Sequence, residues 1–225
     1  MRLVIVLCLF FGTSLTAHAE QFRKAGDSEF SFSIPYNQGS QIEFEGGATA
    51  DVSKDHGFGF GFNYFYTPQI SWRVDTSWHS SQYVGKRKLE DDNSEQTFAH
   101  VYDGFSFTVG GEYYLTQGTV APFVRGSLGW SYINSNIASR PPTGGCWWDP
   151  WWGYTCSVVQ PTYSDTAWRY GAALGVRVAM GESAFVKASY SQDWVDISNT
   201  RGTPKSNTFT IEVGYKINTS YGSLF

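Results

Sequence analysis

The chain has 225 residues, the length of one domain or of one domain with a small appendage. Its formal charge of -4, with basic residues nowhere gathered into a stripe, argues against nucleic acid as a partner. Aromatic residues make up 18% of the chain and glycine fills 24 positions, while the mean hydropathy is slightly polar at -0.29. That composition fits neither a helical membrane protein nor an ordinary soluble enzyme.

The N-terminus has the three parts of a secretory signal. Arg2 precedes an apolar run over residues 3–11, and a small-residue stretch ends in an A-x-A site at 17–19. The sequence therefore predicts a signal peptide at 1–19 that is removed by cleavage, and a mature domain at 20–225.

Eight later segments alternate in the way that membrane-crossing strands do. No stretch after the signal offers about 18 consecutive apolar residues, so a chain that enters a membrane here has to cross as strands of a closed barrel. Barrel strands alternate over about ten residues, apolar toward lipid and polar or small toward the interior. The alternating segments are 29–36, 57–66, 70–84, 101–115, 120–134, 168–180, 184–196 and 208–217.

The gaps between these segments alternate between long and short. The long gaps are 37–56, 85–100, 135–167 and 198–207, and the short ones are 67–69, 117–119 and 181–183. Short periplasmic turns and long outer loops are typical of an up-and-down outer-membrane barrel with both termini in the periplasm. A β-sandwich has no reason to sort its connections in this way.

The fourth and fifth segments predict their own pairing. A hairpin turn at Gly118 and Thr119 places Glu112 opposite Arg125 on the inner face. The same register places the outward Phe107 opposite Trp130 and Phe105 opposite Tyr132. The same register therefore pairs opposite charges on the inner face and aromatic residues on the outer face.

The inward positions collect nearly balanced charges. The basic residues are Arg73, Arg125, Arg169, Arg177, Lys187 and Lys216, and the acidic residues are Glu29, Asp75, Glu112, Asp193 and Glu212. Eight strands enclose little more than side chains, so this set predicts an interior filled by ion pairs and no wide pore. A binding site or a proton relay is the alternative interpretation of the same residues.

The stretches HGFGFGFNYFYTPQISWRVDTSW and EYYLTQGTVAPFVRGSLGWSYI resemble the eight-stranded outer-membrane barrels of the opacity-porin and OmpW-like group. The resemblance covers nearly all of the mature chain and implies an all-β, antiparallel, up-and-down transmembrane barrel in a bacterial outer membrane. It also implies a surface protein that adheres, stabilises the envelope or passes small apolar molecules into the membrane, in contact with outer-membrane lipid and lipopolysaccharide. The terminal Phe225 resembles the signal that the barrel assembly machinery recognises.

The segment CWWDPWWGYTC lies in the long gap at 135–167. Cys146 and Cys156 are the two cysteines left after signal cleavage, and an oxidising compartment favours a disulfide between them. The aromatic residues between them form a candidate binding loop, a platform for a host glycan, a lipid head group or a partner surface: Trp147, Trp148, Trp151, Trp152 and Tyr154. The alternative is an apolar lid that rests on the barrel mouth or dips into the lipopolysaccharide layer.

The sequence thus predicts a small surface barrel with a structural, adhesive or envelope-stabilising role. A narrow channel for small hydrophobic solutes is the first alternative. A lipid-modifying enzyme is the second, since Asp75, Ser77 and His79 share one face, although side chains two apart on a strand are about 7 Å apart. We expect no enzymatic activity, no cofactor and no metal site, and we expect the charged stretch with Asp91 and Asp92 to be a solvated loop tip.

Overall fold

The computed structural model describes residues 22–88 and 95–217. The predicted signal peptide, the pair Asp91 and Asp92, and the terminal Phe225 lie outside the described residues. Within the described residues, no helix is long and apolar enough to cross a membrane.

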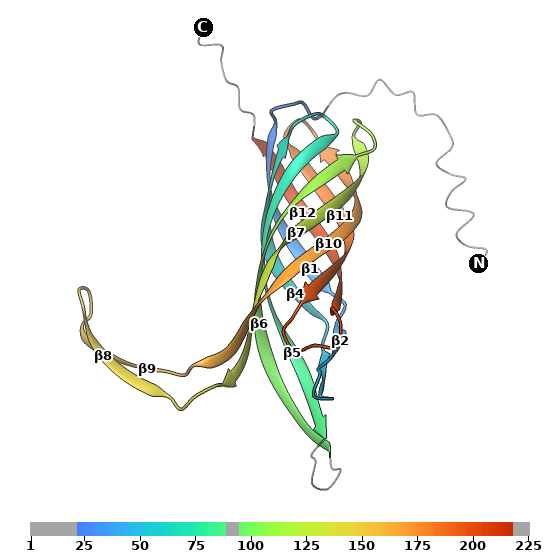
Figure 1. The fold of residues 1–225 in the computed structure, drawn as a ribbon. Coiled ribbons are helices and arrows are strands. Elements are labelled where there is room, and N and C mark those ends of the chain that lie inside the picture. The colour runs from blue at the N-terminus through green and yellow to red at the C-terminus, as the bar shows by residue number, and fades with distance from the viewer. Residues whose placement is uncertain (1–21, 89–94, 218–225) are drawn as a thin grey trace.

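Antiparallel strands form a closed ring (Figure 1). The strands are β1 (Ser28–Asn37), β2 (Ser40–Glu43), β3 (Thr49–Val52), β4 (Asp55–Phe65), β5 (Ile70–Lys88), β6 (Glu95–Tyr114), β7 (Val120–Ala138), β8 (Thr143–Asp149), β9 (Gly153–Val159), β10 (Thr162–Met180), β11 (Ala184–Asp196) and β12 (Lys205–Ile217). Among the described residues the ring runs β1, β4, β5, β6, β7, β10, β11, β12 and back to β1. The predicted eight-stranded barrel is confirmed.

The period-2 pattern decides which side chains face inward. On β1, Glu29, Ser31 and Ser33 are buried, while the alternating Phe30 and Phe32 are more than 40% exposed on the outer wall. A shift of one residue would reverse every such assignment, so the register is strongly specified.

The predicted register between β6 and β7 is confirmed. Glu112 pairs with Arg125, Phe105 with Tyr132 and Phe107 with Trp130. The rings of Phe107 and Trp130 stack with their centroids 4.6 Å apart on the outer wall. Such cross-strand aromatic pairs stabilise a ladder beyond the area they cover.

The two ends of the barrel differ. Short connections at 66–69, 115–119 and 181–183 mark one end, called the turn end below, where the described chain also begins and finishes. At the opposite loop end, the strands outrun the predicted segments, because β5 continues to Lys88 and β6 begins at Glu95. The predicted gap at 85–100 was therefore wrong in its limits.

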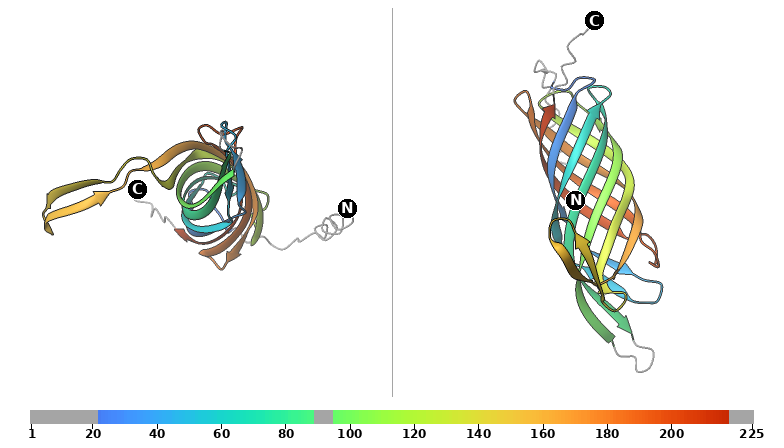
Figure 2. Two further views of the ribbon diagram at one scale, coloured as in Figure 1. Left: turned by 90° about the horizontal axis from the view of Figure 1, so that it is seen from below. Right: turned by 90° about the vertical axis from the view of Figure 1, so that its left-hand side faces the viewer.

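The predicted loop at 135–167 is also mostly strand. β7 continues to Ala138, β10 begins at Thr162, and β8 and β9 form a separate hairpin between them. A three-residue bulge separates the hairpin from the barrel ladder, since Asn134 pairs with Ser164 but Ala138 pairs with Thr162. Beyond the bulge the hairpin leaves the cylinder sideways (Figure 1 and Figure 2).

The long gap at 37–56 contains a hairpin that the sequence analysis did not predict. β2 and β3 pair with each other, and β3 adds to the outer part of β5 through Thr49 opposite Lys86. The hairpin stands at the loop end and contributes apolar side chains to the mouth of the barrel.

Candidate functional site

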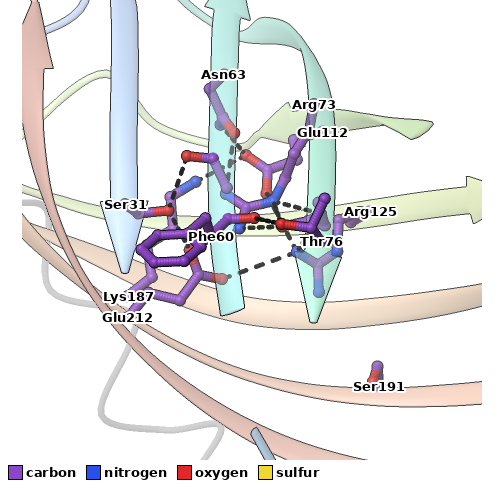
Figure 3. A network of polar contacts seen from close by, with 12 residues as sticks. Ser31, Phe60, Asn63, Arg73, Thr76, Glu112, Arg125, Lys187, Ser191 and Glu212 are labelled. Carbon is purple, nitrogen blue, oxygen red and sulfur yellow. Dashed lines mark hydrogen bonds and ion pairs between the residues drawn. The ribbon is translucent and has the colours of Figure 1, made fainter. Parts of the chain in front are cut away.

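A network of ion pairs crosses the middle of the bore. The Arg73 guanidinium lies 2.8 Å from a Glu212 carboxylate oxygen and 2.6 Å from an Asp75 oxygen. Lys187 Nζ lies 2.9 Å from Glu112 Oε2, so charges carried by β5, β6, β11 and β12 meet inside the bore (Figure 3). Arg73, Glu112, Lys187 and Glu212 are each at most 2% exposed.

Arg125 from β7 completes the network. Its Nη1 lies 3.7 to 3.8 Å from carboxylate oxygens of Asp75, Glu112 and Glu212. Three cations therefore face three carboxylates, and this central network carries no net charge: Arg73, Arg125 and Lys187 against Asp75, Glu112 and Glu212. Balance matters here, because an unpaired charge in a low-dielectric interior costs several kcal/mol.

Neutral donors add hydrogen bonds to the carboxylate oxygens that Lys187 and Arg73 contact. Asn63 Nδ2 and the Tyr114 hydroxyl each donate to Glu112 Oε2 at 2.6 Å. The Ser31 hydroxyl donates to Glu212 Oε2 at 3.2 Å, and the Asn63 carbonyl accepts from Arg73 Nη1 at 2.9 Å. These bonds fix the rotamers of the charged side chains and leave the centre of the bore filled.

An aromatic cluster closes the bore toward the turn end. Phe65, Tyr114 and Phe123 are at most 1% exposed and pack with ring centroids 5.5 to 5.6 Å apart. Lys187 Nζ lies 5.5 Å from the centroid of the Tyr114 ring, and the Phe185 ring receives the Arg177 guanidinium at 4.6 Å. These distances are within cation–π range.

Arg23, ahead of β1, seals the same end. It donates from Nε to the Pro68 carbonyl at 3.1 Å and from Nη2 to the Thr116 carbonyl at 2.5 Å, and its guanidinium lies 4.3 Å from the Tyr114 ring centroid. Burial, followed by the positive charge of Arg177, lowers the pKa of the Arg23 guanidinium from its usual value. Arg23 thereby ties the segment before the barrel to two turns.

The sequence analysis missed the aromatic cluster and Arg23. Phe65, Tyr114, Phe123 and Phe185 stand at inward parity directly beside outward apolar residues, so position parity alone could have found them. Arg23 carries no such signal, because it precedes the first alternating segment.

The other predicted interior charges form three separate pairs. Arg177 lies 2.6 Å from Glu29, and Arg169 lies 2.8 Å from Asp193. Lys216 pairs at 2.7 Å with Asp27, which the sequence analysis did not name. All the charges predicted to point inward are on the inner face, and Arg169 and Asp75 are the more accessible of them.

On the loop-end side of the central network, the interior holds a cavity of about 70 Å³. Arg73, Arg125, Asp75 and Arg169 contribute to its wall, together with hydroxyl side chains such as Ser106. The space is polar and large enough to hold ordered water.

A larger pocket of about 220 Å³ lies at the loop end, inside the mouth of the barrel. Apolar side chains make most of its wall: Ile42, Phe44, Ala50, Val52, Ile133, Val195, Ile197 and Pro204. Asp55, His79, Tyr102 and Arg169 supply polar groups. Apolar walls with a few polar groups are typical of small-molecule sites.

The structure does not assemble the Asp75, Ser77 and His79 arrangement. The Asp75 carboxylate is held by Arg73, and the His79 ring packs edge-on against Tyr102 with centroids 5.6 Å apart. Among the described residues, no hydrogen bond joins Ser77 to His79 or His79 to Asp75. His79 instead lines the mouth pocket.

The predicted candidate loop is the β8–β9 hairpin. Cys146 pairs directly with Cys156, and a disulfide joins them. The aromatic side chains of the loop are all on the surface, with Trp147 48% exposed and Trp148, Trp151, Trp152 and Tyr154 at least 72% exposed. The hairpin does not cover the barrel mouth (Figure 2).

Comparisons with known proteins agree with this architecture. The model of the family described as "outer membrane protein beta-barrel domain" matches residues 5–216. A search of the curated proteins finds no match.

Solved structures give the same fold at low sequence identity. OprG of Pseudomonas aeruginosa is 17% identical with a TM-score of 0.54, covering 88% of this chain and 99% of that chain. Neisserial surface protein A is 14% identical with a TM-score of 0.53, covering 84% and 97%, and the outer membrane protein AlkL is 13% identical with a TM-score of 0.51, covering 88% and 92%. The chain belongs to the outer membrane protein β-barrel family and is a protein of the bacterial outer membrane.

Proposed function

We propose that the protein is a non-conducting surface barrel with an adhesive or envelope-stabilising role. Its functional surfaces are at the loop end. The observation that carries the proposal is the neutral network of three cations and three carboxylates across the bore. An ion in transit would have to displace buried pairs whose separation costs several kcal/mol each. The aromatic cluster of Phe65, Tyr114 and Phe123 adds a second barrier on the turn-end side of the network.

Single-channel recording in planar lipid bilayers tests this proposal. We expect the wild-type protein to give no discrete conductance steps. Phe123→Ala removes only the aromatic barrier and leaves the ion pairs, so this variant should also give no conductance steps. Regular conductance steps from the wild-type protein would refute the proposal, and steps from Phe123→Ala alone would assign the closure to the aromatic cluster and not to the ion pairs.

A second candidate function is the capture of small hydrophobic solutes from outside the cell. The mouth pocket favours it, because apolar side chains from β3, β7 and β11 line a volume of about 220 Å³ beside the buried Asp55. A pocket of this kind binds apolar molecules by removing them from water.

Filling the pocket tests the second candidate. Ile197→Trp should weaken the binding of a small apolar fluorophore to the purified protein, measured by its emission. Ile211→Trp adds the same bulk on the outer wall, where Ile211 is 46% exposed, and should leave pocket binding unchanged. Equal binding by wild type and Ile197→Trp would discard the solute hypothesis.

A further inference from the structure

The β8–β9 hairpin, Thr143–Val159, forms a tryptophan arm with two different faces. Trp148 pairs with Tyr154 and Cys146 with Cys156, so these side chains share one face with Val158. Trp147, Thr155 and Ser157 lie on the opposite face. Trp148, Tyr154 and Val158 are each 72% exposed, so the first face is apolar and uncovered.

The arm is almost free of charge. Between Arg140 and Asp165 the only charged residue is Asp149. Its Oδ1 accepts hydrogen bonds from the backbone amides of Trp151 at 2.8 Å and Trp152 at 3.0 Å. Asp149 therefore builds the turn, and the arm offers no cation to a sulfated or phosphorylated polymer.

The tip of the arm carries its most exposed aromatic rings. Trp151 is 88% and Trp152 is 83% exposed. Indole rings with an apolar body and one N–H donor are enriched where a membrane meets water. A tip of this composition suits the boundary between lipid and solvent better than free solution.

The direction of the arm places its tip beside the barrel (Figure 1). The arm leaves the barrel sideways at the loop end, and its tip curves back to the level of the barrel wall; two perpendicular views agree on this (Figure 1 and Figure 2). Close to the root of the arm, the outer wall of the barrel carries exposed aromatic side chains such as Trp168 and Tyr132.

The change of direction has a defined cause at the root of the arm. Asn136, in the bulge of β7, has a φ of 54°, a left-handed conformation that Asn adopts more readily than most residues. Its Nδ2 donates to the Val101 carbonyl at 3.1 Å and to Asp103 Oδ2 at 2.8 Å, which ties the bulge to β6. Bulges bend strands, and this one is bonded in place.

We propose that the tryptophan arm docks on the outer leaflet of the membrane that holds the barrel, with Trp148, Trp151, Trp152 and Tyr154 among the lipid head groups. The two edges of this two-stranded hairpin keep unpaired amides and carbonyls, which hydrocarbon does not tolerate. The arm therefore lies along the interface and does not penetrate the hydrocarbon core. It is a lateral anchor that fixes how the loop end is oriented on the membrane surface.

Paramagnetic attenuation of the indole N–H signals tests the proposal in the full-length protein. The protein, with ¹⁵N-labelled tryptophan, is placed in phosphatidylcholine nanodiscs that contain lipopolysaccharide. Trp151→Phe and Trp152→Phe each remove one signal and so assign the tip. Trp168, 66% exposed on the barrel wall, is the internal lipid-facing reference.

We expect a lipid spin-labelled near its head group to attenuate the Trp151 and Trp152 signals at least as strongly as that of Trp168. A water-soluble gadolinium chelate should attenuate them weakly. Strong attenuation by the chelate and none by the lipid label would overturn the proposal and would place the arm in water, where a partner on another surface could reach it.

Discussion

Breaking the ion pair between Lys187 and Glu112 should destabilise the barrel strongly, and removing both partners should restore part of the loss. At their separation of 2.9 Å the two charges attract by about 6 kcal/mol for an effective dielectric constant of about 20. Lys187→Met leaves the central network with one excess negative charge, and Glu112→Gln leaves one excess positive charge. Each single variant should lose about 3 to 5 kcal/mol of unfolding free energy, because it strands a buried charge.

The double variant returns the network to two cations and two carboxylates. Its loss should be smaller than the combined losses of the single variants by up to about 3 kcal/mol. The assay is urea unfolding in lipid vesicles, followed by tryptophan fluorescence and by gel mobility with and without boiling. The matched control is the exposed pair Lys86 and Asp51, 3.7 Å apart, where Lys86→Met should change stability by less than about 1 kcal/mol. Single variants as stable as the control, or a double variant whose loss is fully additive, would refute the reasoning.

Three further predictions concern packing, the arm and the bulge. Phe123→Ala should cost about 3 to 5 kcal/mol in the same urea assay, because Phe123 is 1% exposed within the aromatic cluster; a loss below about 1 kcal/mol would contradict the packing described. Replacing Cys146 and Cys156 by serine should leave barrel unfolding unchanged but should speed chymotrypsin cleavage in the arm, since the bridge stabilises so short a loop by about 2 to 3 kcal/mol; equal cleavage would argue against that role. Asn136→Val should be less stable than Asn136→Gly by about 1 to 2 kcal/mol, because both lose the side-chain bonds and only valine opposes the positive φ; equal stability would disprove this account of the bulge.

The sequence predicted the membrane-embedded part of the fold well, because lipid on one side and ion pairs on the other restrict every position. The pairing of Glu112 with Arg125 illustrates this: a slip of one residue would have turned charges toward lipid and phenylalanines inward. Near the loop end both faces of a strand meet water, so alternation weakens. The limits of β5, β6, β7 and β10 were missed for that reason, and so was the β2–β3 hairpin.

The interior was predicted in its residues but not in its partners. Parity identified Arg73, Arg177 and Lys216 as inward, whereas the choice of Glu29 for Arg177 and Asp27 for Lys216 depends on barrel stagger and on a segment before β1. Phe65 was harder to recognise as inward, because it lies between Tyr64 and Tyr66 and adjacent aromatic residues hide the alternation.

β7 pairs with only part of β6, and the point where this pairing stops limits how far the hydrocarbon layer can extend toward the loop end. From Ile70 to Lys88, β5 pairs with β6 along its whole length, but β7 accompanies β6 only as far as Asp103 opposite Asn134. In the described part of the chain, β6 from Glu95 to Tyr102 has β5 as its only strand partner. The Asn136 side chain bonds the Val101 carbonyl, and the rest of this free edge must be hydrated. The acyl chains therefore have to end at or below the Asp103–Asn134 rung, just above Phe105 and Tyr132, and the protein's own backbone defines its depth in the bilayer.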